Sequence, residues 1–195
     1  CAQGFLARGL PLHLLVNNAG LAGARGLSAS GFELTFGVNH MGTFLLTQLL
    51  LERLKASAPA RIVTVASRAH TRVRGIDFAV LRQPTQGTGG LPEYGVSKLA
   101  NVLFSAELGR RLAGTGVSTY ALHPGVVATD VWRQVPGPLR WLMKLGMISA
   151  EEGARTTLHC ATAPALAGGS GLYYDQCRPI APSAAGQDLA LAAEL

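Results

Sequence analysis

The chain has 195 residues, of which 48% are apolar and 14% charged, and its formal net charge is +6. This length supports one domain with a sizeable core, and the composition excludes a disordered, highly charged chain. No run of about 18 uninterrupted apolar residues predicts a membrane-spanning helix, and no signal peptide is visible.

Short apolar runs that predict buried strands alternate with longer stretches of helical periodicity. The predicted order is a strand at 12–16, a helix within 31–55, a strand at 61–66, a loop to residue 90, a helix with Tyr94 and Lys98 at its start that ends near 114, a strand at 117–122, a helix from 149 or 150, and a short last strand at 171–174. This alternation predicts an α/β protein with a parallel sheet covered on both faces. No repeat, linker or second domain is visible, so residues 1–195 are expected to form a single domain.

The net positive charge raises the question of nucleic-acid binding. The arginines are scattered, and Arg68, Arg72 and Arg74 form the only local group. No zinc-finger spacing or RNA-binding aromatic motif accompanies them. A solvated basic surface is therefore the favoured interpretation, and no nucleic-acid partner is expected.

The cysteines and histidines predict neither a disulfide scaffold nor a metal site. The three cysteines, Cys1, Cys160 and Cys177, form no Cys-x-x-Cys pair, which fits a reducing compartment. Four histidines do not have the spacing of a metal site: His40, His70, His123 and His159. We expect them to be structural and expect no metal.

Polar residues follow three successive predicted strands, at 17–20, at Ser67 and at 124–129. In parallel α/β sheets ligands bind outside the carboxyl ends of the strands. We therefore expect these three segments to line one edge of the sheet together.

Tyr94 and Lys98 are four residues apart on a predicted helix, so they share one face. An ammonium group beside a phenol lowers the phenol's pKa and makes it usable as an acid and base; the alternative is a surface pair. Ser67 offers a hydroxyl to a carbonyl oxygen bound at the sheet edge, or else bonds its own turn. Asn39, inside the first long helix, is either an exposed neutral residue or a buried polar anchor.

Five motifs in this order and spacing resemble the short-chain dehydrogenase/reductase family: Leu-Leu-Val-Asn-Asn-Ala-Gly at 14–20, Val-Asn-His at 38–40, Ser67 after Ile-Val-Thr-Val-Ala, Tyr-Gly-Val-Ser-Lys at 94–98, and His-Pro-Gly-Val-Val-Ala-Thr at 123–129. The long gap between Ser67 and Tyr94, with the stretches at 99–104, 158–161 and 170–177, resembles the retinol dehydrogenase branch. The resemblance covers nearly the whole chain and implies a Rossmann-like, doubly wound sheet.

The resemblance also implies roles for the polar residues. Tyr94 would be the general acid/base, Lys98 would lower its pKa and hold the nicotinamide ribose, and Ser67 would orient the substrate oxygen. Asn39 would hold a water that relays protons to Lys98. The further cofactor contacts would come from Asn17, Ala19, Gly20, Pro124, Gly125, Val127 and Thr129. The cofactor would be NADP or NAD, with NADP slightly preferred.

One family feature is missing from the sequence. The family opens with a strand and a Gly-rich turn that takes the pyrophosphate at a helix N-terminus, whereas Gly20, Gly23 and Gly26 follow a different strand. The resemblance therefore implies an N-terminally truncated chain that lacks about three strands, a partial dinucleotide-binding domain. The residue that selects NAD or NADP, and any membrane anchor, would lie in that part. We expect the chain alone not to bind NAD(P)H with useful affinity.

Residues 131–147 are apolar and basic, with Trp132, Trp141 and Met147 among them. One interpretation is a lipophilic substrate wall or a lip that faces a membrane. The alternative is core packing around two short helices.

The expected function is an NAD(P)-dependent oxidoreductase that interconverts a hydrophobic alcohol and its aldehyde or ketone, retinol dehydrogenase-like, with Tyr94 as acid and base. The alternative is a catalytically inactive truncated chain, or a scaffold or binding protein on the same fold. The expected location is cytoplasmic or membrane-associated, in a reducing compartment. Oligomeric state, reaction direction and exact substrate stay open.

Overall fold

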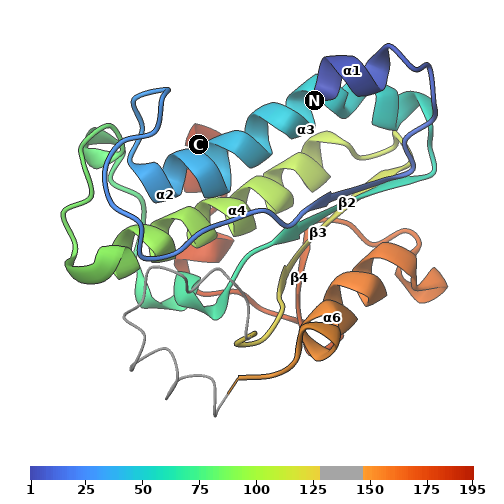
Figure 1. Cartoon of the computed structure of the whole chain (residues 1–195). Helices are drawn as coiled ribbons and strands as arrows, with labels where there is room; N and C mark the ends of the chain where they lie inside the picture. The colour runs from blue at the N-terminus through green and yellow to red at the C-terminus, as the bar shows by residue number, and fades with distance from the viewer. Residues whose placement is uncertain (128–146) are drawn as a thin grey trace.

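A computed structural model describes residues 1–127 and 147–195 (Figure 1). Its five strands lie in the order β1-β2-β3-β4-β5, which is also their order along the chain. They are β1 Leu14–Asn17, β2 Ala60–Val65, β3 Val117–His123, β4 Leu172–Asp175 and β5 Arg178–Ile180. Strands β1 to β4 are parallel, and β5 is antiparallel to β4.

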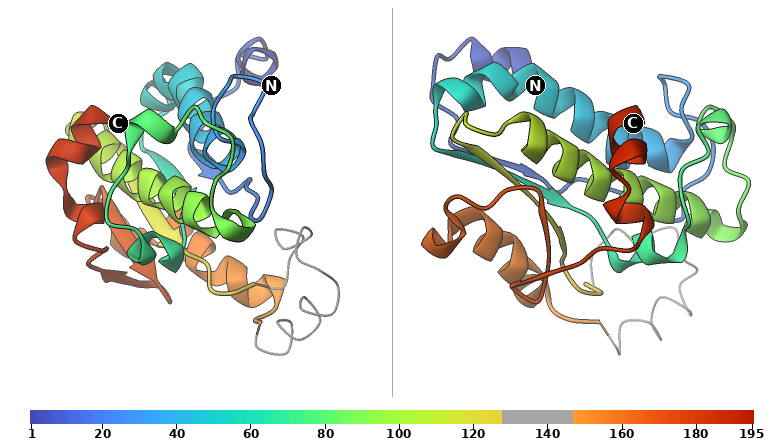
Figure 2. Two further views of the ribbon diagram at one scale, coloured as in Figure 1. Left: turned by 90° about the vertical axis from the view of Figure 1, so that its left-hand side faces the viewer. Right: turned by 180° about the vertical axis from the view of Figure 1, so that it is seen from behind.

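Helices cover both faces of this sheet. Figures 1 and 2 show α3 and α4 on one face and α6 on the other. The α-helices are α1 Ala2–Leu6, α2 Leu34–Phe36, α3 Gly42–Ala56, α4 Leu91–Arg111, α6 Ala150–Thr162 and α7 Leu189–Glu194. A π-helical turn, η1 Gly37–Met41, joins α2 to α3, and the 3-10 turns are η2 Arg68–Arg72, η3 Phe78–Val80, η4 Thr88–Gly90, η6 Pro164–Leu166 and η7 Ala185–Gln187. The predicted parallel α/β sheet is thus confirmed.

The burial of each strand follows from its place in the sheet. Five of the six residues of β2 are buried, because β2 has neighbours on both sides and helices on both faces. In β1, an edge strand, buried and exposed residues alternate, and Leu14 and Val16 remain 39% and 38% exposed. The core against α3 and α4 contains Leu54, Ile62 and Phe104. The core against α6 contains Val63, Tyr120 and Tyr174, among others.

The helix α6 begins where the sequence predicts. Ser149 is its N-cap and accepts a hydrogen bond from the Glu152 amide, while the Glu152 carboxylate accepts one from the Ser149 amide. Such a capping box satisfies two amides that would otherwise lack partners at a helix start.

The sequence predicts that the strand at 171–174 is the last one. This prediction is wrong, because a further strand, β5, turns back and pairs with β4. The connecting residues Gln176 and Cys177 both have positive φ, 48° and 61°. Hairpin turns of this kind usually carry glycine or asparagine, so a turn at these two residues is not predictable from their types. The short helices α1 and α7 were not predicted either.

In the part of the chain that the structure describes, no helix is long and apolar enough to cross a bilayer. The described residues place no strand on the outer side of β1.

Candidate active site

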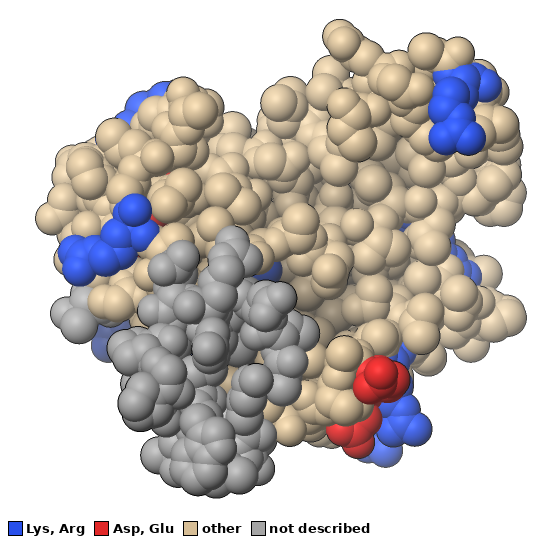
Figure 3. All heavy atoms as spheres, viewed as in Figure 1, with Lys and Arg blue, Asp and Glu red and all other residues tan. Residues whose placement is uncertain are grey.

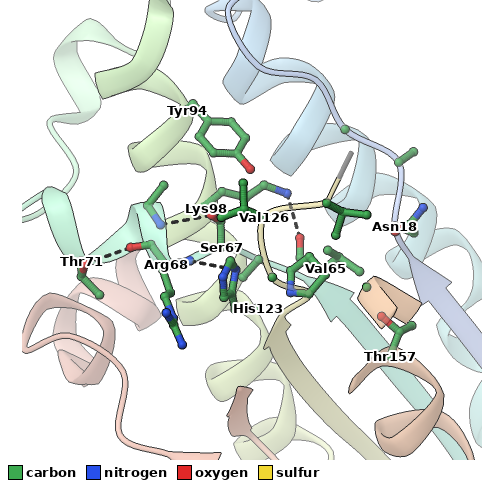
Figure 4. A pocket seen from close by; sticks show the side chains of 18 of the residues that line it. Asn18, Val65, Ser67, Arg68, Thr71, Tyr94, Lys98, His123, Val126 and Thr157 are labelled. Carbon is green, nitrogen blue, oxygen red and sulfur yellow. Dashed lines mark hydrogen bonds between the residues drawn. The ribbon is translucent and has the colours of Figure 1, made fainter. Parts of the chain in front are cut away.

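A cavity of about 1330 Å³ opens at the carboxyl ends of β1, β2 and β3 (Figure 4). Its walls come from the three segments that the sequence predicted to meet: residues 18–20 after β1, 66–69 after β2 and 123–127 after β3. Tyr94 and Lys98 of α4 line it too. The convergence that strand order predicts is therefore present in the structure.

Ser67 and Tyr94 meet in this cavity. Ser67 leaves β2 with an extended backbone and caps η2, and its hydroxyl oxygen accepts from the Ala69 amide at 3.1 Å. Ser67 also lies near the Tyr94 phenol and acts to lower the phenol's pKa. Ser67 thus bonds its own turn, as the alternative proposed, and also faces Tyr94.

Gly95 lets α4 approach the turn that carries Ser67. A Cβ on Gly95 would lie 2.9 Å from Val73 Cγ1 and 3.1 Å from the Ala69 carbonyl oxygen. Any larger residue would push α4 away from η2, and the Tyr94 phenol would move with it.

The pKa of Tyr94 does not follow the expectation from its spacing to Lys98. Burial raises the phenol's pKa, and the nearby Ser67 hydroxyl acts in the opposite direction. Lys98 Nζ lies over the ring face, 5.6 Å from the centroid, and donates to the Val65 carbonyl at 2.8 Å. In this structure Ser67, rather than Lys98, is the group that opposes the rise in the pKa of Tyr94.

Lys98 is a buried cation. Its side chain is held between α4 and the end of β2, and burial lowers its pKa to about 8. The ammonium form therefore still predominates at pH 7. A charge in such a weakly solvated place acts more strongly on a neighbouring oxyanion than it would in water.

Asn39 is a buried anchor, the second of the two alternatives. It lies in the π-helical turn η1, and its amide group accepts from Leu21 N at 2.8 Å and donates to Leu21 O at 3.0 Å and to Ser97 Oγ at 3.1 Å. A Cβ on Gly20 would lie 3.1 Å from Asn39 Oδ1 and 3.6 Å from Lys98 Nζ. The glycine therefore keeps open the space that Asn39 and Lys98 share.

Most of the predicted cofactor contacts line the cavity: Ala19, Gly20, Pro124, Gly125 and Val127. Asn17 is a correction, because its side chain points to α3 and donates to Thr47 Oγ1 at 3.0 Å. Successive side chains of a strand face opposite sides, and Val16 and Asn18 line the cavity instead. Thr129 and the apolar segment up to residue 146 lie outside the described residues.

His123 and Arg68 join the site although the sequence did not single them out for it. His123 Nδ1 accepts from the Arg68 amide at 3.3 Å, and Arg68 Nε donates to Asp175 Oδ2 at 2.6 Å. Burial lowers the pKa of His123 to about 4, which keeps the imidazole neutral and able to accept. The sequence feature that could have indicated His123 as a site residue is the His-Pro-Gly motif at the end of β3.

Comparisons with known proteins bear on this geometry. A family model described as short chain dehydrogenase matches residues 2–80. Human retinol dehydrogenase 12 is 49% identical over 180 residues, which cover 91% of this chain and 56% of that protein. Human retinol dehydrogenase 11 is 46% identical over 179 residues, with coverage of 90% and 56%.

A solved structure is also similar along the whole chain. The crystal structure of an uncharacterized protein from Mycobacterium Paratuberculosis is 32% identical, with a TM-score of 0.73, and the match covers 98% of this chain and 67% of that one. The chain belongs to the short-chain dehydrogenase family. The chain spans about half the length of the curated relatives it matches.

The described residues of the cavity fit the nicotinamide half of a dinucleotide. Gly20 and Gly125 leave its wall without side chains at two strand ends, and Gly125 has a φ of +94°. The described residues that line the cavity include no Gly-rich turn for the pyrophosphate. Across residues 1–127 and 147–195 no cluster of three or more His, Cys, Asp or Glu side chains could hold a metal ion.

Figure 3 shows the Lys and Arg side chains of one face lying apart from one another. On this face they do not form the continuous basic patch that typifies nucleic-acid binders.

Proposed function

We propose that this chain carries the acid–base site of an NAD(P)-dependent oxidoreductase that interconverts a hydrophobic alcohol and its aldehyde or ketone. The observation that carries the proposal is the meeting of Ser67, Tyr94 and Lys98 in one cavity at the strand ends. We also propose that residues 1–195 form one partial dinucleotide-binding domain.

Each side chain has a task at the substrate oxygen. Ser67 Oγ donates a hydrogen bond that orients and polarises the carbonyl, and Tyr94 Oη gives up its proton as the oxygen gains charge. The Lys98 ammonium stabilises the phenolate that Tyr94 leaves behind. Asn39 holds a water beside Lys98 and so relays protons to it. A bound nicotinamide cofactor supplies or accepts the hydride.

The same cavity would hold the nicotinamide end of NADP or NAD, with NADP preferred. Ala19, Gly20, Pro124, Gly125 and Val127 would contact it, and Lys98 would hold the ribose. Thr129, outside the described residues, belongs to the same proposal.

The substrate is proposed to be retinoid-like. Apolar residues line the cavity beside Tyr94, namely Val73, Leu91, Pro92 and Val126. A wall of this kind favours a lipophilic chain over a polar one, and similar proteins are named retinol dehydrogenases. Three free cysteines support a reducing compartment, in the cytoplasm or at a membrane.

A second candidate is a scaffold or binding protein without turnover. The observation in its favour is that the described residues lining the cavity include no Gly-rich turn for the pyrophosphate. The two candidates differ in what they predict when that turn is supplied.

The test compares the 195-residue chain with a chimera in which the N-terminal segment of human retinol dehydrogenase 12 precedes Cys1. Calorimetry with NADPH should show saturable binding for the chimera and none for the chain, because the pyrophosphate site is supplied only in the former. The chimera should also reduce retinal faster than a short polar aldehyde. A folded chimera that binds NADPH and reduces no aldehyde would leave the scaffold as the better proposal. Low-micromolar binding by the chain alone would show that another segment replaces the Gly-rich turn.

A further inference from the structure

The backbone of Ser67 is held by a residue outside the proposed chemistry. The Ser67 carbonyl oxygen accepts two hydrogen bonds from His70, one from its amide at 3.1 Å and one from ring atom Nδ1 at 2.6 Å. His70 lies in η2 and is 1% exposed. The ring therefore fixes the turn on which the Ser67 hydroxyl is carried.

The other ring nitrogen of His70 reaches a distant part of the chain. Nε2 lies 3.2 Å from the Ser183 amide nitrogen, 113 positions away in sequence. A carbonyl oxygen can only accept and a backbone amide can only donate. Both bonds exist together only if the imidazole is neutral, with its proton on Nδ1.

Packing around His70 favours the same state. The ring meets Tyr173 of β4 edge-on, with centroids 4.9 Å apart. Burial is the main influence on the His70 pKa and lowers it, which disfavours the doubly protonated ring. That form would carry a proton on Nε2 and could no longer accept from Ser183.

The C-terminal segment that contains Ser183 is itself packed on α4, the helix of Tyr94 and Lys98. The Gly186 amide donates to Ser183 Oγ at 3.2 Å, and a Cβ on Gly186 would lie 3.3 Å from Val102 Cγ1 of α4. Ala192 of α7 packs in one cluster with Leu99 of α4. Figure 2 shows this red C-terminal segment crossing α4.

We infer that His70 is a positioning residue: its imidazole clamps the Ser67 turn to the C-terminal segment, and so fixes the Ser67 hydroxyl relative to Tyr94. Residues 182–195 thereby serve the active site without lining the cavity. The catalytic part of this inference rests on the proposed function.

The geometric part is tested on the 195-residue chain without cofactor or substrate. Long-range ¹H–¹⁵N NMR should show a neutral His70 protonated at Nδ1, and hydrogen exchange should show a protected Ser183 amide. In His70→Asn the Ser183 amide should lose its protection, because asparagine can donate to Ser67 O but is too short to reach Ser183. A proton on Nε2, or a Ser183 amide that exchanges freely in the unaltered chain, would overturn the clamp whether or not the enzyme proposal holds.

The catalytic part is tested in the chimera described above. His70→Asn and His70→Gln each remove one of the two hydrogen bonds of the His70 ring, to Ser67 or to Ser183. Each should lower kcat by tens of fold, since small displacements of an orienting group cost up to about 10²-fold. The matched control is His159→Asn, because His159 is half-buried and meets Tyr174 of β4 with centroids 6.0 Å apart, yet no described residue hydrogen-bonds its ring. It should keep the kcat of the unaltered chimera.

A double-mutant cycle separates positioning from general loss of stability. If His70 acts through Ser67, its substitutions should cause little further loss of kcat in a Ser67→Ala background. An equal loss in both backgrounds, or an unchanged kcat in folded His70→Asn and His70→Gln, would overturn the inference.

Discussion

The two sides of the cavity are built differently. On the side of β2 and α4, Ser67 and Lys98 each have hydrogen-bond partners within the chain, and Lys98 is buried. On the side of β1, the strand lies at the edge of the described sheet and Leu14 and Val16 remain exposed.

This difference separates what the chain can do by itself from what it cannot. The proposed acid–base groups are held by packing among β2, η2 and α4, all of which this sequence contains. The proposed cofactor contacts near β1 come from the backbone turn at Ala19 and Gly20, which follows an edge strand of the described sheet. We therefore expect changes on the β2 side to have large effects and changes at the β1 edge to have small ones.

The largest effect is expected at Tyr94. Tyr94→Phe keeps the ring and removes the proton, so turnover in the chimera should fall by about 10²–10⁴-fold. Tyr174→Phe is the matched control, because Tyr174 packs against α6 and does not line the cavity. Steady-state retinal reduction measures both variants. Turnover near the unaltered value in Tyr94→Phe would mean that the proton comes from another group.

The next largest effect is expected on stability, from a comparison of Ile62 in β2 with Leu14 in the neighbouring strand β1. Ile62 in β2 is 1% exposed, and Ile62→Ala should lower the free energy of unfolding by about 2–5 kcal/mol through a cavity in the core. Leu14→Ala in β1 should cost well under half of that loss, because Leu14 is already 39% exposed. Urea unfolding of the chain measures both. Equal losses would show that the outer face of β1 is covered in solution.

A pH effect is expected from His40, which packs behind the Asn39 turn. Burial lowers its pKa to about 4 from a usual 6.5, against a hydrogen bond with Asn101 that raises it. The unfolded chain therefore takes up the proton first, so stability is present above about pH 6.5 and falls as the pH drops toward 4. The loss should be about 3 kcal/mol. His40→Gln should reduce the slope of unfolding free energy against pH over this window, in which His123, whose pKa is also lowered to about 4, still contributes. An unchanged slope would assign the titration to other groups.

The smallest effect on stability is expected from a charge on the β1 edge. Leu14→Lys should change the free energy of unfolding by about 0.5 kcal/mol or less. It should also slow aggregation of the chain, because a lysine on an edge strand opposes pairing with another copy. Light scattering at constant temperature follows aggregation. Unchanged aggregation would mean that this edge is not where copies associate.

Much of this arrangement follows from the sequence. The apolar runs predict β1 to β4, and strand order predicts that Ser67 and the turns at 17–20 and 124–127 share one edge of the sheet, because parallel strands end on the same side. The spacing of Tyr94 and Lys98 places both on one helix face. These predictions depend on local periodicity and chain order, which a sequence records directly.

Other features depend on contacts between residues far apart in the chain. Asn17 turned away from the cavity because the strand's alternation assigned that side chain to Thr47. The pKa of Tyr94 is raised because burial outweighs the opposing effect of Ser67, and Lys98 Nζ lies 5.6 Å from the ring centroid. His70 is a structural histidine, as predicted, but its partners on the two ring nitrogens, Ser67 and Ser183, are known only from the structure. Burial, side-chain direction and tautomer are set by what packs around a residue, and only the tertiary structure decides that.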